Sequence, residues 1–103
     1  MSEAFNNVSV NKIANIYFDG KCVSHTITLA DGVRKSVGVI LPSTLTFNVG
    51  VPEIMELLAG KGRVQVNGGD WQNIDGVMTF SVPENGNFVI EVVETIHYVC
   101  HFG

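Results

Sequence analysis

From Ile16 onward, short apolar or alternating runs are separated by turn residues. The runs read IYF, CVSHTITL, SVGVIL, STLTFNV, EIMELLAG, RVQV, VMTFSV, NFVIEVV and IHYVCHF, and pairs such as Asp19-Gly20, Asp31-Gly32 and Asp75-Gly76 lie between them. Alternation with a period of two is typical of strands, and glycine supplies the positive φ that tight turns need. About nine short strands at this spacing predict an all-β barrel or sandwich.

One segment, Val51 to Leu58, competes as a helix because it is rich in Glu, Met and Leu. We interpret it as a strand, since Gly60 and the alternating RVQV that follows make it half of a hairpin. Residues 1–12 are polar and Asn-rich without a sustained period, which predicts a flexible arm or an added edge strand. Residues 13–103 contain no repeat or charge run, so we expect them to form a single domain.

Composition and charge exclude several classes of partner. The chain has 103 residues, of which 46% are hydrophobic, and a formal net charge of −4. Its basic residues are scattered from Lys12 to Arg63, whereas nucleic-acid binding needs clustered cations. No apolar stretch approaches the roughly 20 residues of a membrane-spanning helix, and no secretory signal is visible. We therefore expect a soluble, cytoplasmic protein that binds neither nucleic acid nor membrane.

The small size and the two cysteines add two expectations. A domain of this length buries only about two thirds of its unfolded surface, which favours a homodimer. Cys22 and Cys100 have neither metal-binding nor redox spacing, so both are expected to be reduced thiols.

A first resemblance lies in the second half of the chain. The order of Glu56-Leu57-Leu58-Ala59-Gly60, an alternating strand, Gly76, Val82-Pro83 and a turn into Phe88 is similar to that of a cupin barrel of the jelly-roll type. The metal-binding histidines of both cupin motifs are replaced, in Gly50-Val51-Pro52-Glu53-Ile54-Met55 and in Gly86-Asn87-Phe88-Val89. The resemblance implies a metal-free, cupin-like β-barrel.

A closer resemblance covers about residues 16–102. It rests on Tyr17-Phe18-Asp19-Gly20-Lys21, Arg34-Lys35-Ser36-Val37-Gly38-Val39, Thr46-Phe47, Pro52-Glu53-Ile54-Met55, Val82-Pro83 and Tyr98-Val99-Cys100-His101. In order and spacing these motifs resemble the small pyrimidine/purine nucleoside phosphorylase family. The resemblance implies a homodimeric bacterial cupin that cleaves purine and pyrimidine nucleosides with inorganic phosphate to free base and pentose 1-phosphate, without a further cofactor. The family carries arginine where His101 stands.

Phosphorolysis requires a cation that holds phosphate near an oxocarbenium-like sugar. Arg34 is the candidate for catalysis and phosphate binding, because a guanidinium presents a planar fork to two phosphate oxygens. On a strand, Arg34, Ser36 and Gly38 share one face, which would place a hydroxyl beside the guanidinium and open space above Gly38. Ser36 and His101 are the further candidate phosphate ligands. The alternatives are a surface Arg-Lys pair and an exposed histidine near the C-terminus.

Sugar and base require a carboxylate and a flat apolar surface. Glu53 and Glu56 lie on opposite faces of a regular strand, and we prefer Glu53 as the catalytic carboxylate over Glu56, which is kept as a nucleoside-binding candidate. Phe47, Phe88 and Tyr98 are candidates for stacking on the base, although each would serve equally well as core. Either glutamate would alternatively be a solvated edge carboxylate.

The remaining candidate residues are given no catalytic or metal-binding role. Trp71 is expected at the surface or in a dimer contact. His97 and His101 share one strand face, while His25 belongs to another strand, so the pair lacks a third ligand of fixed spacing and no metal site is predicted. A non-catalytic cupin that binds a sugar or nucleoside is the main alternative function, and a structural dimer module is the third.

Overall fold

The structure is a computed structural model that describes residues 3–103. Within these residues the chain forms nine strands and one short 3-10 helix, which confirms the predicted all-β class. The elements are β1 (Ser9–Val10), β2 (Asn15–Tyr17), the 3-10 helix η1 (Phe18–Gly20), β3 (Cys22–Thr28), β4 (Arg34–Ile40), β5 (Ser43–Asn48), β6 (Glu53–Val66), β7 (Trp71–Asp75), β8 (Met78–Val82) and β9 (Asn87–Phe102).

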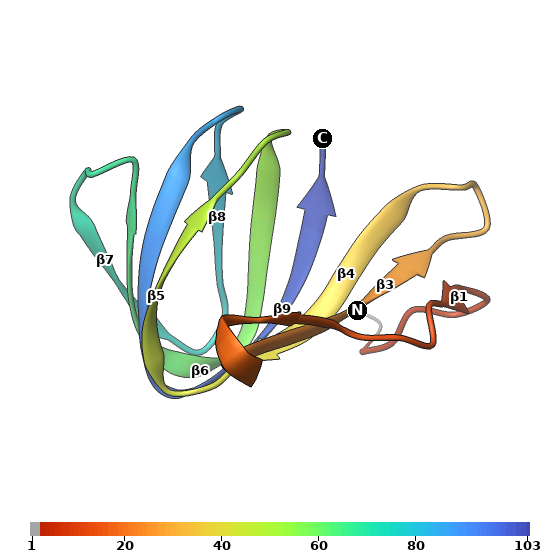
Figure 1. Cartoon of the computed structure of the whole chain (residues 1–103), viewed down its shortest axis with the longest axis horizontal. Helices are drawn as coiled ribbons and strands as arrows, with labels where there is room; N and C mark the ends of the chain where they lie inside the picture. The colour runs from red at the N-terminus through yellow and green to blue at the C-terminus, as the bar shows by residue number, and fades with distance from the viewer. Residues whose placement is uncertain (1–2) are drawn as a thin grey trace.

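Two long antiparallel strands, β6 and β9, organise the fold (Figure 1). The first part of β9 pairs with β5 and its last part with β4, while the first part of β6 pairs with β8 and its second part with β7. Both strands therefore belong to two layers that face each other across the core. The hydrogen-bonded path runs β1-β3-β4-β9-β6-β7 without joining its ends, so the sheet is bent around the core and remains open.

The expected hairpin around Gly60 is wrong, because β6 continues through this residue as a single strand of 14 residues. Its pairing with β9 shifts register between Leu57 and Gly62, as β-bulges do. Gly60 has φ +113°, and a Cβ there would lie 2.7 Å from the Cα of Ile96. This glycine therefore marks a bulge and a close approach of two strands, where the sequence pattern indicated a turn.

The other boundaries differ for related reasons. The runs NFVIEVV and IHYVCHF belong to one strand, β9, of 16 residues. β7 was not expected, because only Ile74 of its five residues is buried and its alternation is weak. The run IYF ends as a strand at Tyr17, since Phe18 and Asp19 adopt φ of 53° and 54° in the turn that follows.

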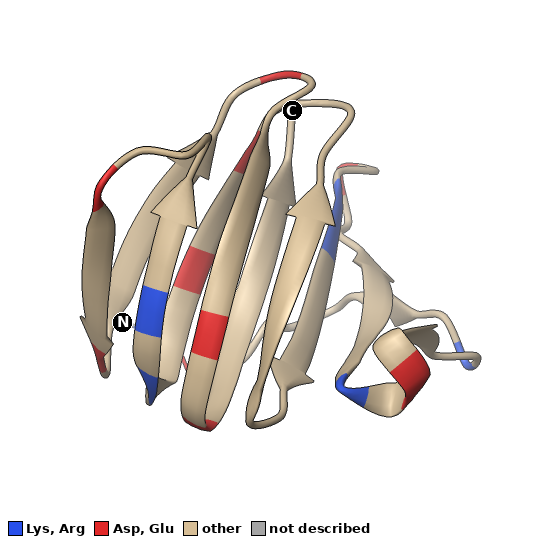
Figure 2. Cartoon of the chain, turned by 60° about the vertical axis from the view of Figure 1, so that its left-hand side comes forward, with Lys and Arg blue, Asp and Glu red and all other residues tan. Residues whose placement is uncertain are grey.

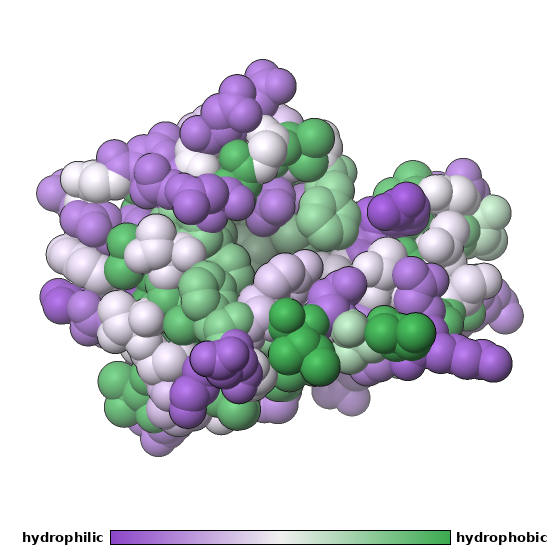
Figure 3. Space-filling model, viewed as in Figure 1, coloured by the Kyte–Doolittle hydropathy of each residue, from purple (hydrophilic) through white to green (hydrophobic). Residues whose placement is uncertain are grey.

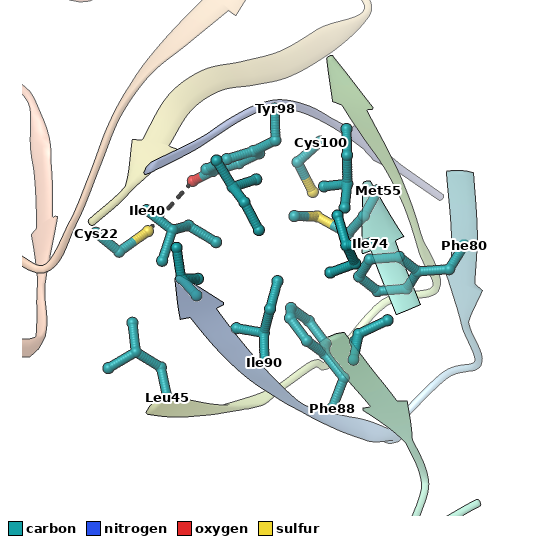
Figure 4. Packing of buried hydrophobic residues seen from close by; sticks show 14 of the residues in the cluster. Cys22, Ile40, Leu45, Met55, Ile74, Phe80, Phe88, Ile90, Tyr98 and Cys100 are labelled. Atoms are coloured by element: carbon teal, nitrogen blue, oxygen red, sulfur yellow. Dashed lines mark hydrogen bonds between the residues drawn. The ribbon is translucent and has the colours of Figure 1, made fainter. Parts of the chain in front are cut away.

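The core lies between the two layers (Figure 4). Inward positions of β9 alternate as expected for a half-buried strand, and Ile90 and Ile96 are fully buried. Leu57 and Val64 of β6 are equally inaccessible. Phe88 packs among these residues and is 2% exposed.

The N-terminal region lies along one edge of the sheet. Ser9 and Val10 pair with Thr28 and Ile27 of β3, and β2 pairs with the first part of β3. Residues 1–2 of the predicted arm lie outside the described residues. Among residues 3–103, the structure contains no helix with the length and apolar character needed to cross a membrane.

Candidate active site

A cavity of about 160 Å³ lies between the layers and is lined by side chains of β2 to β6 and of β9. Its apolar wall comprises Ile40, Phe47, Val49, Met55, Phe88 and Phe102. Its polar wall comprises Tyr17, Ser24, Ser36, Asn48, Glu53 and Tyr98. On the face drawn in Figure 3, apolar atoms gather in the middle and hydrophilic residues surround them. Pockets for larger organic ligands usually exceed about 300 Å³, so this cavity suits one ring-sized group with the rest of a ligand toward the opening.

Glu53 is the carboxylate of the cavity. It is the first residue of β6, and its Oε1 accepts a hydrogen bond from Cys100 Sγ at 3.4 Å. Burial raises the pKa of Glu53, and the hydrogen bond from Cys100 acts in the opposite direction. A half-buried carboxylate in this cavity interacts strongly with a positive charge that develops beside it, because partial burial lowers the effective dielectric constant below that of water.

Strand alternation and register bring the side chains of Ser36, Tyr98 and Cys100 together near Glu53. Ser36 of β4 is paired with Cys100 of β9, which in turn is paired with Met55 of β6, so their side chains form one row on the inner face. Tyr98 lies two residues before Cys100 on the same face, and its hydroxyl contacts Cys22 Sγ at 3.4 Å (Figure 4). Burial is the main cause that raises the pKa values of both Tyr98 and Cys100.

The aromatic side chains predicted to stack are neighbours. Phe47 and Phe88 are register partners, and their rings are stacked with centroids 4.9 Å apart and planes inclined by 17°. Phe18 forms a T-shaped pair with Phe47, and Phe80 forms one with Phe88, at centroid distances of 5.2 and 5.3 Å. Phe88 is buried while Phe47 is partly exposed, so Phe47 offers the accessible ring at the cavity.

Three predicted site residues do not line the cavity. Arg34 is exposed at the first position of β4, on the strand face that carries Ser36 but beyond the cavity wall. Glu56 and His101 lie on the opposite, outer face of the sheet, where His101 Nε2 is 2.9 Å from Glu56 Oε1. The expected open space above Gly38 is absent, because a Cβ there would meet Ser24 Cβ at 2.7 Å.

The outer-face contacts of His101 occupy both ring nitrogens. Nδ1 is 2.7 Å from Lys35 Nζ, and Nε2 is 2.9 Å from Glu56 Oε1. An ammonium group can only donate, so Nδ1 accepts from Lys35 and Nε2 donates to Glu56. A phosphate would have to displace one of these partners to bind His101.

Sequence reasoning missed several residues of the cavity. Tyr17, Ser24 and Asn48 line it but were not proposed, and Cys100 was expected only to be a reduced thiol. Strand alternation could have identified Ser24 and Cys100 as inward-facing. Ser24 lies two residues after the buried Cys22, and Cys100 lies two residues after Tyr98, so each shares a face with an inward residue. Tyr17 and Asn48 come from strand ends, where alternation does not define the direction of the following turn.

Other candidates lie apart from the cavity. Trp71 is 37% exposed, and the Arg63 guanidinium lies 4.0 Å from its ring centroid. His25 contacts the backbone oxygen of Asn11. The basic residues lie in separate places along the ribbon (Figure 2). Across residues 3–103, no three His, Cys, Asp or Glu side chains are grouped to hold a metal ion, and both cysteines are free and buried.

Solved structures place the fold among cupins. A cupin-2 domain from Rhodospirillum rubrum is similar with a TM-score of 0.68 at 11% identity, covering 97% of this chain and 72% of that one. This likeness concerns the fold alone and confirms the predicted cupin-like architecture. A crystal structure of a protein of unknown function from Acinetobacter sp. ADP1 is much more similar, with a TM-score of 0.93, 42% identity and coverage of 99% of this chain and 100% of that chain.

Sequence comparisons give the family. The family model for pyrimidine/purine nucleoside phosphorylase matches residues 12–102. A pyrimidine/purine nucleoside phosphorylase from Cupriavidus metallidurans is 61% identical over 100 residues, which cover 96% of this chain and 97% of the relative. The match spans β2 to β9 and so includes every strand that lines the cavity. The chain belongs to the pyrimidine/purine nucleoside phosphorylase family.

Proposed function

We propose that this protein is a nucleoside phosphorylase that cleaves pyrimidine and purine nucleosides with inorganic phosphate. In this reaction a phosphate oxygen forms a bond to the anomeric carbon of the pentose, while the glycosidic bond to the base nitrogen breaks. The base leaves with the bonding electrons and takes up a proton, and pentose 1-phosphate remains. Family membership supports this activity, and the observation that carries it in the structure is Glu53 in an aromatic-walled cavity.

Glu53 serves in this proposal as the catalytic carboxylate. The sugar acquires positive charge as the glycosidic bond breaks, and an acceptor that grips a ribose hydroxyl strengthens at that moment. Phe47 and Phe88 provide the flat apolar surface for the base, and Tyr98 adds a hydroxyl nearby. Ile40, Val49, Met55 and Phe102 share the cavity wall with these rings. An apolar surface of this kind agrees with tolerance of both base classes, because a tight hydrogen-bond code would select one.

Phosphate is the co-substrate, and no metal or organic cofactor is part of the proposal. Ser36 presents a hydroxyl at the cavity wall, and Arg34 lies on the same face of β4 toward solvent. Phosphate held between these groups would enter from the exposed end of β4. The predicted role of His101 requires release of its contacts with Lys35 and Glu56 and stays a prediction.

We further propose a homodimer in the cytoplasm. Apolar side chains on the outer face of β6 are exposed, with Ile54 at 45% and Leu58 at 46%. A second subunit would cover such surface, which a domain of this size cannot bury by itself. The free thiols Cys22 and Cys100 agree with a reducing compartment. Light scattering coupled to size-exclusion chromatography tests the dimer, and a monomeric mass would contradict it.

A stoichiometric assay tests the activity. Purified protein is incubated with uridine or adenosine, with and without phosphate, and base, pentose 1-phosphate and phosphate are quantified by chromatography. We expect base and pentose 1-phosphate to appear in equal amounts, and only when phosphate is present. Saturable binding of nucleosides without release of base would contradict the proposal and favour a non-catalytic binding cupin.

A further inference from the structure

Cys100 has a position that the proposed reaction does not yet explain. It lines the cavity, is 4% exposed, and its Sγ lies 3.4 Å from Oε1 of Glu53. The other buried thiol, Cys22, instead contacts the hydroxyl of Tyr98. The two cysteines therefore differ in one testable respect, because only Cys100 touches the carboxylate.

The hydrogen bonds around Cys100 have a direction. Burial raises the pKa of the Cys100 thiol to about 12, and the charge of Glu53 adds to the effect. The thiol therefore stays protonated and donates a hydrogen bond to the carboxylate. A protonated thiol is not a nucleophile at neutral pH. The Ser36 hydroxyl interacts with the sulfur from the neighbouring strand and opposes this shift, as a donor to sulfur does. The chain of donors runs from Ser36 to Cys100 to Glu53.

We propose that Cys100 is a positioning residue that fixes the Glu53 carboxylate, holding one oxygen so that the other faces the sugar. The inference rests on the proposed function of Glu53. Glutamate has several rotatable bonds, and a donor on a rigid strand removes much of that freedom before substrate arrives. Because β9 is paired on both sides, by β4 and by β6, the sulfur is held in place by the sheet.

The proposal also predicts how the acidity of the site responds. Titratable side chains that share the cavity with Glu53 are Tyr17 from β2 and Tyr98 and Cys100 from β9. The residues found in its lining include no lysine, arginine or histidine. Loss of the thiol donor removes an interaction that favours the ionised carboxylate, so Glu53 should then bind its proton more tightly.

The first test measures kcat/KM for uridine against pH in Cys100→Ala, Cys100→Ser and the matched control Cys22→Ala. We expect Cys100→Ala to move the acid limb to higher pH and to lower kcat/KM on that limb about 3- to 10-fold, since one weak donor to a charge is lost. Cys100→Ser keeps a donor and should restore the wild-type limb. Cys22→Ala removes the same volume from the core without touching Glu53 and should leave the limb in place.

The second test measures the pKa of Glu53 directly, in the absence of substrate turnover. Its side-chain carboxyl carbon is titrated by ¹³C NMR in the same variants, with the signal assigned by its absence in Glu53→Gln. An unchanged titration in Cys100→Ala, or a Cys100→Ser protein that titrates like Cys100→Ala, overturns the proposal. If Cys100→Ala does not fold, Cys100→Val provides the apolar comparison. Absence of base release by wild-type protein would reject the proposed function, whereas the NMR titration would still decide the role of Cys100.

Discussion

Replacement of Glu53 by glutamine gives the sharpest test of the site. The change keeps the shape of the side chain and removes its negative charge, while Phe47, Phe88 and the strand pairing of β6 remain. If Glu53 stabilises charge on the sugar, Glu53→Gln must lose rate. If it is a solvated edge carboxylate, the rate must stay unchanged.

The structure sets the size of the expected loss. Two unit charges 4 Å apart interact by about 1 kcal/mol in water and by about 4 kcal/mol at an effective dielectric constant of about 20. Glu53 is half-buried on a cavity wall, which places its interaction between these limits. We expect kcat/KM to fall about 100-fold, which corresponds to about 2.7 kcal/mol of transition-state stabilisation.

Although Glu53→Gln should lose rate, we expect it to keep or gain thermal stability. Burial raises the pKa of Glu53 in the folded protein above its value in the unfolded chain. Below the pKa that Glu53 has in the unfolded chain, the carboxyl is protonated in both states and costs the folded state nothing. As the pH rises through the pKa of Glu53 in the folded protein, the buried carboxylate becomes charged and the folded state loses stability. Glutamine carries no charge, so Glu53→Gln should unfold at the same or a higher temperature than wild type at pH 7, and its stability should depend less on pH.

Glu56→Gln is the matched control, since it makes the same chemical change on the outer face of the same strand. Rates of uracil release and thermal unfolding are compared for wild type and both variants. We expect Glu56→Gln to retain kcat/KM within about twofold, a change of no more than about 0.4 kcal/mol. Equal losses in the two variants, or a Glu53→Gln enzyme within twofold of wild type, would refute the assignment.

Three further outcomes follow from the structure. Arg34→Ala should raise the KM for phosphate about tenfold, with partial recovery in Arg34→Lys, because an exposed charged contact is worth only about 1.4 kcal/mol; an unchanged KM would place phosphate elsewhere. Activity should survive dialysis against a chelator, and metal analysis should find no stoichiometric transition metal; loss of activity that added metal restores would contradict this. Gly60→Ala should destabilise the fold by about 1–3 kcal/mol in denaturant titration, because its φ of +113° strains a side chain that would also meet Thr95 O at 2.6 Å; wild-type stability would refute the packing argument.

The fold class and the faces of many strands could be predicted from the sequence. Alternation placed Ser36 and Arg34 on one face of β4, and it separated Glu53 from Glu56, as the structure shows. These predictions succeed because the period of two is a local property of the backbone. Pairing partners such as Ser36 with Cys100 depend on contacts across 64 residues, which no local pattern encodes.

The position of Arg34 illustrates a different limit. Alternation gave its face correctly, but depth along the strand depends on where the neighbouring strands end. Arg34 pairs with Thr28 at the end of the β3–β4 hairpin, and β9 pairs with β4 only from Lys35 onward. The guanidinium is therefore beyond the region that two layers enclose. A local pattern shows which side a residue faces but not how far the cavity extends.

The glycines of β6 connect the fold to the site more closely than the sequence pattern indicated. Before the bulges, the inward positions of β6 are odd-numbered and include Glu53, Met55 and Leu57. After them the buried position is even-numbered, Val64. A regular strand cannot satisfy both, since a shift of one residue turns every side chain to the opposite face. The irregular register at Gly60 and Gly62 lets one strand bury its second half in the core and still direct Glu53 into the cavity.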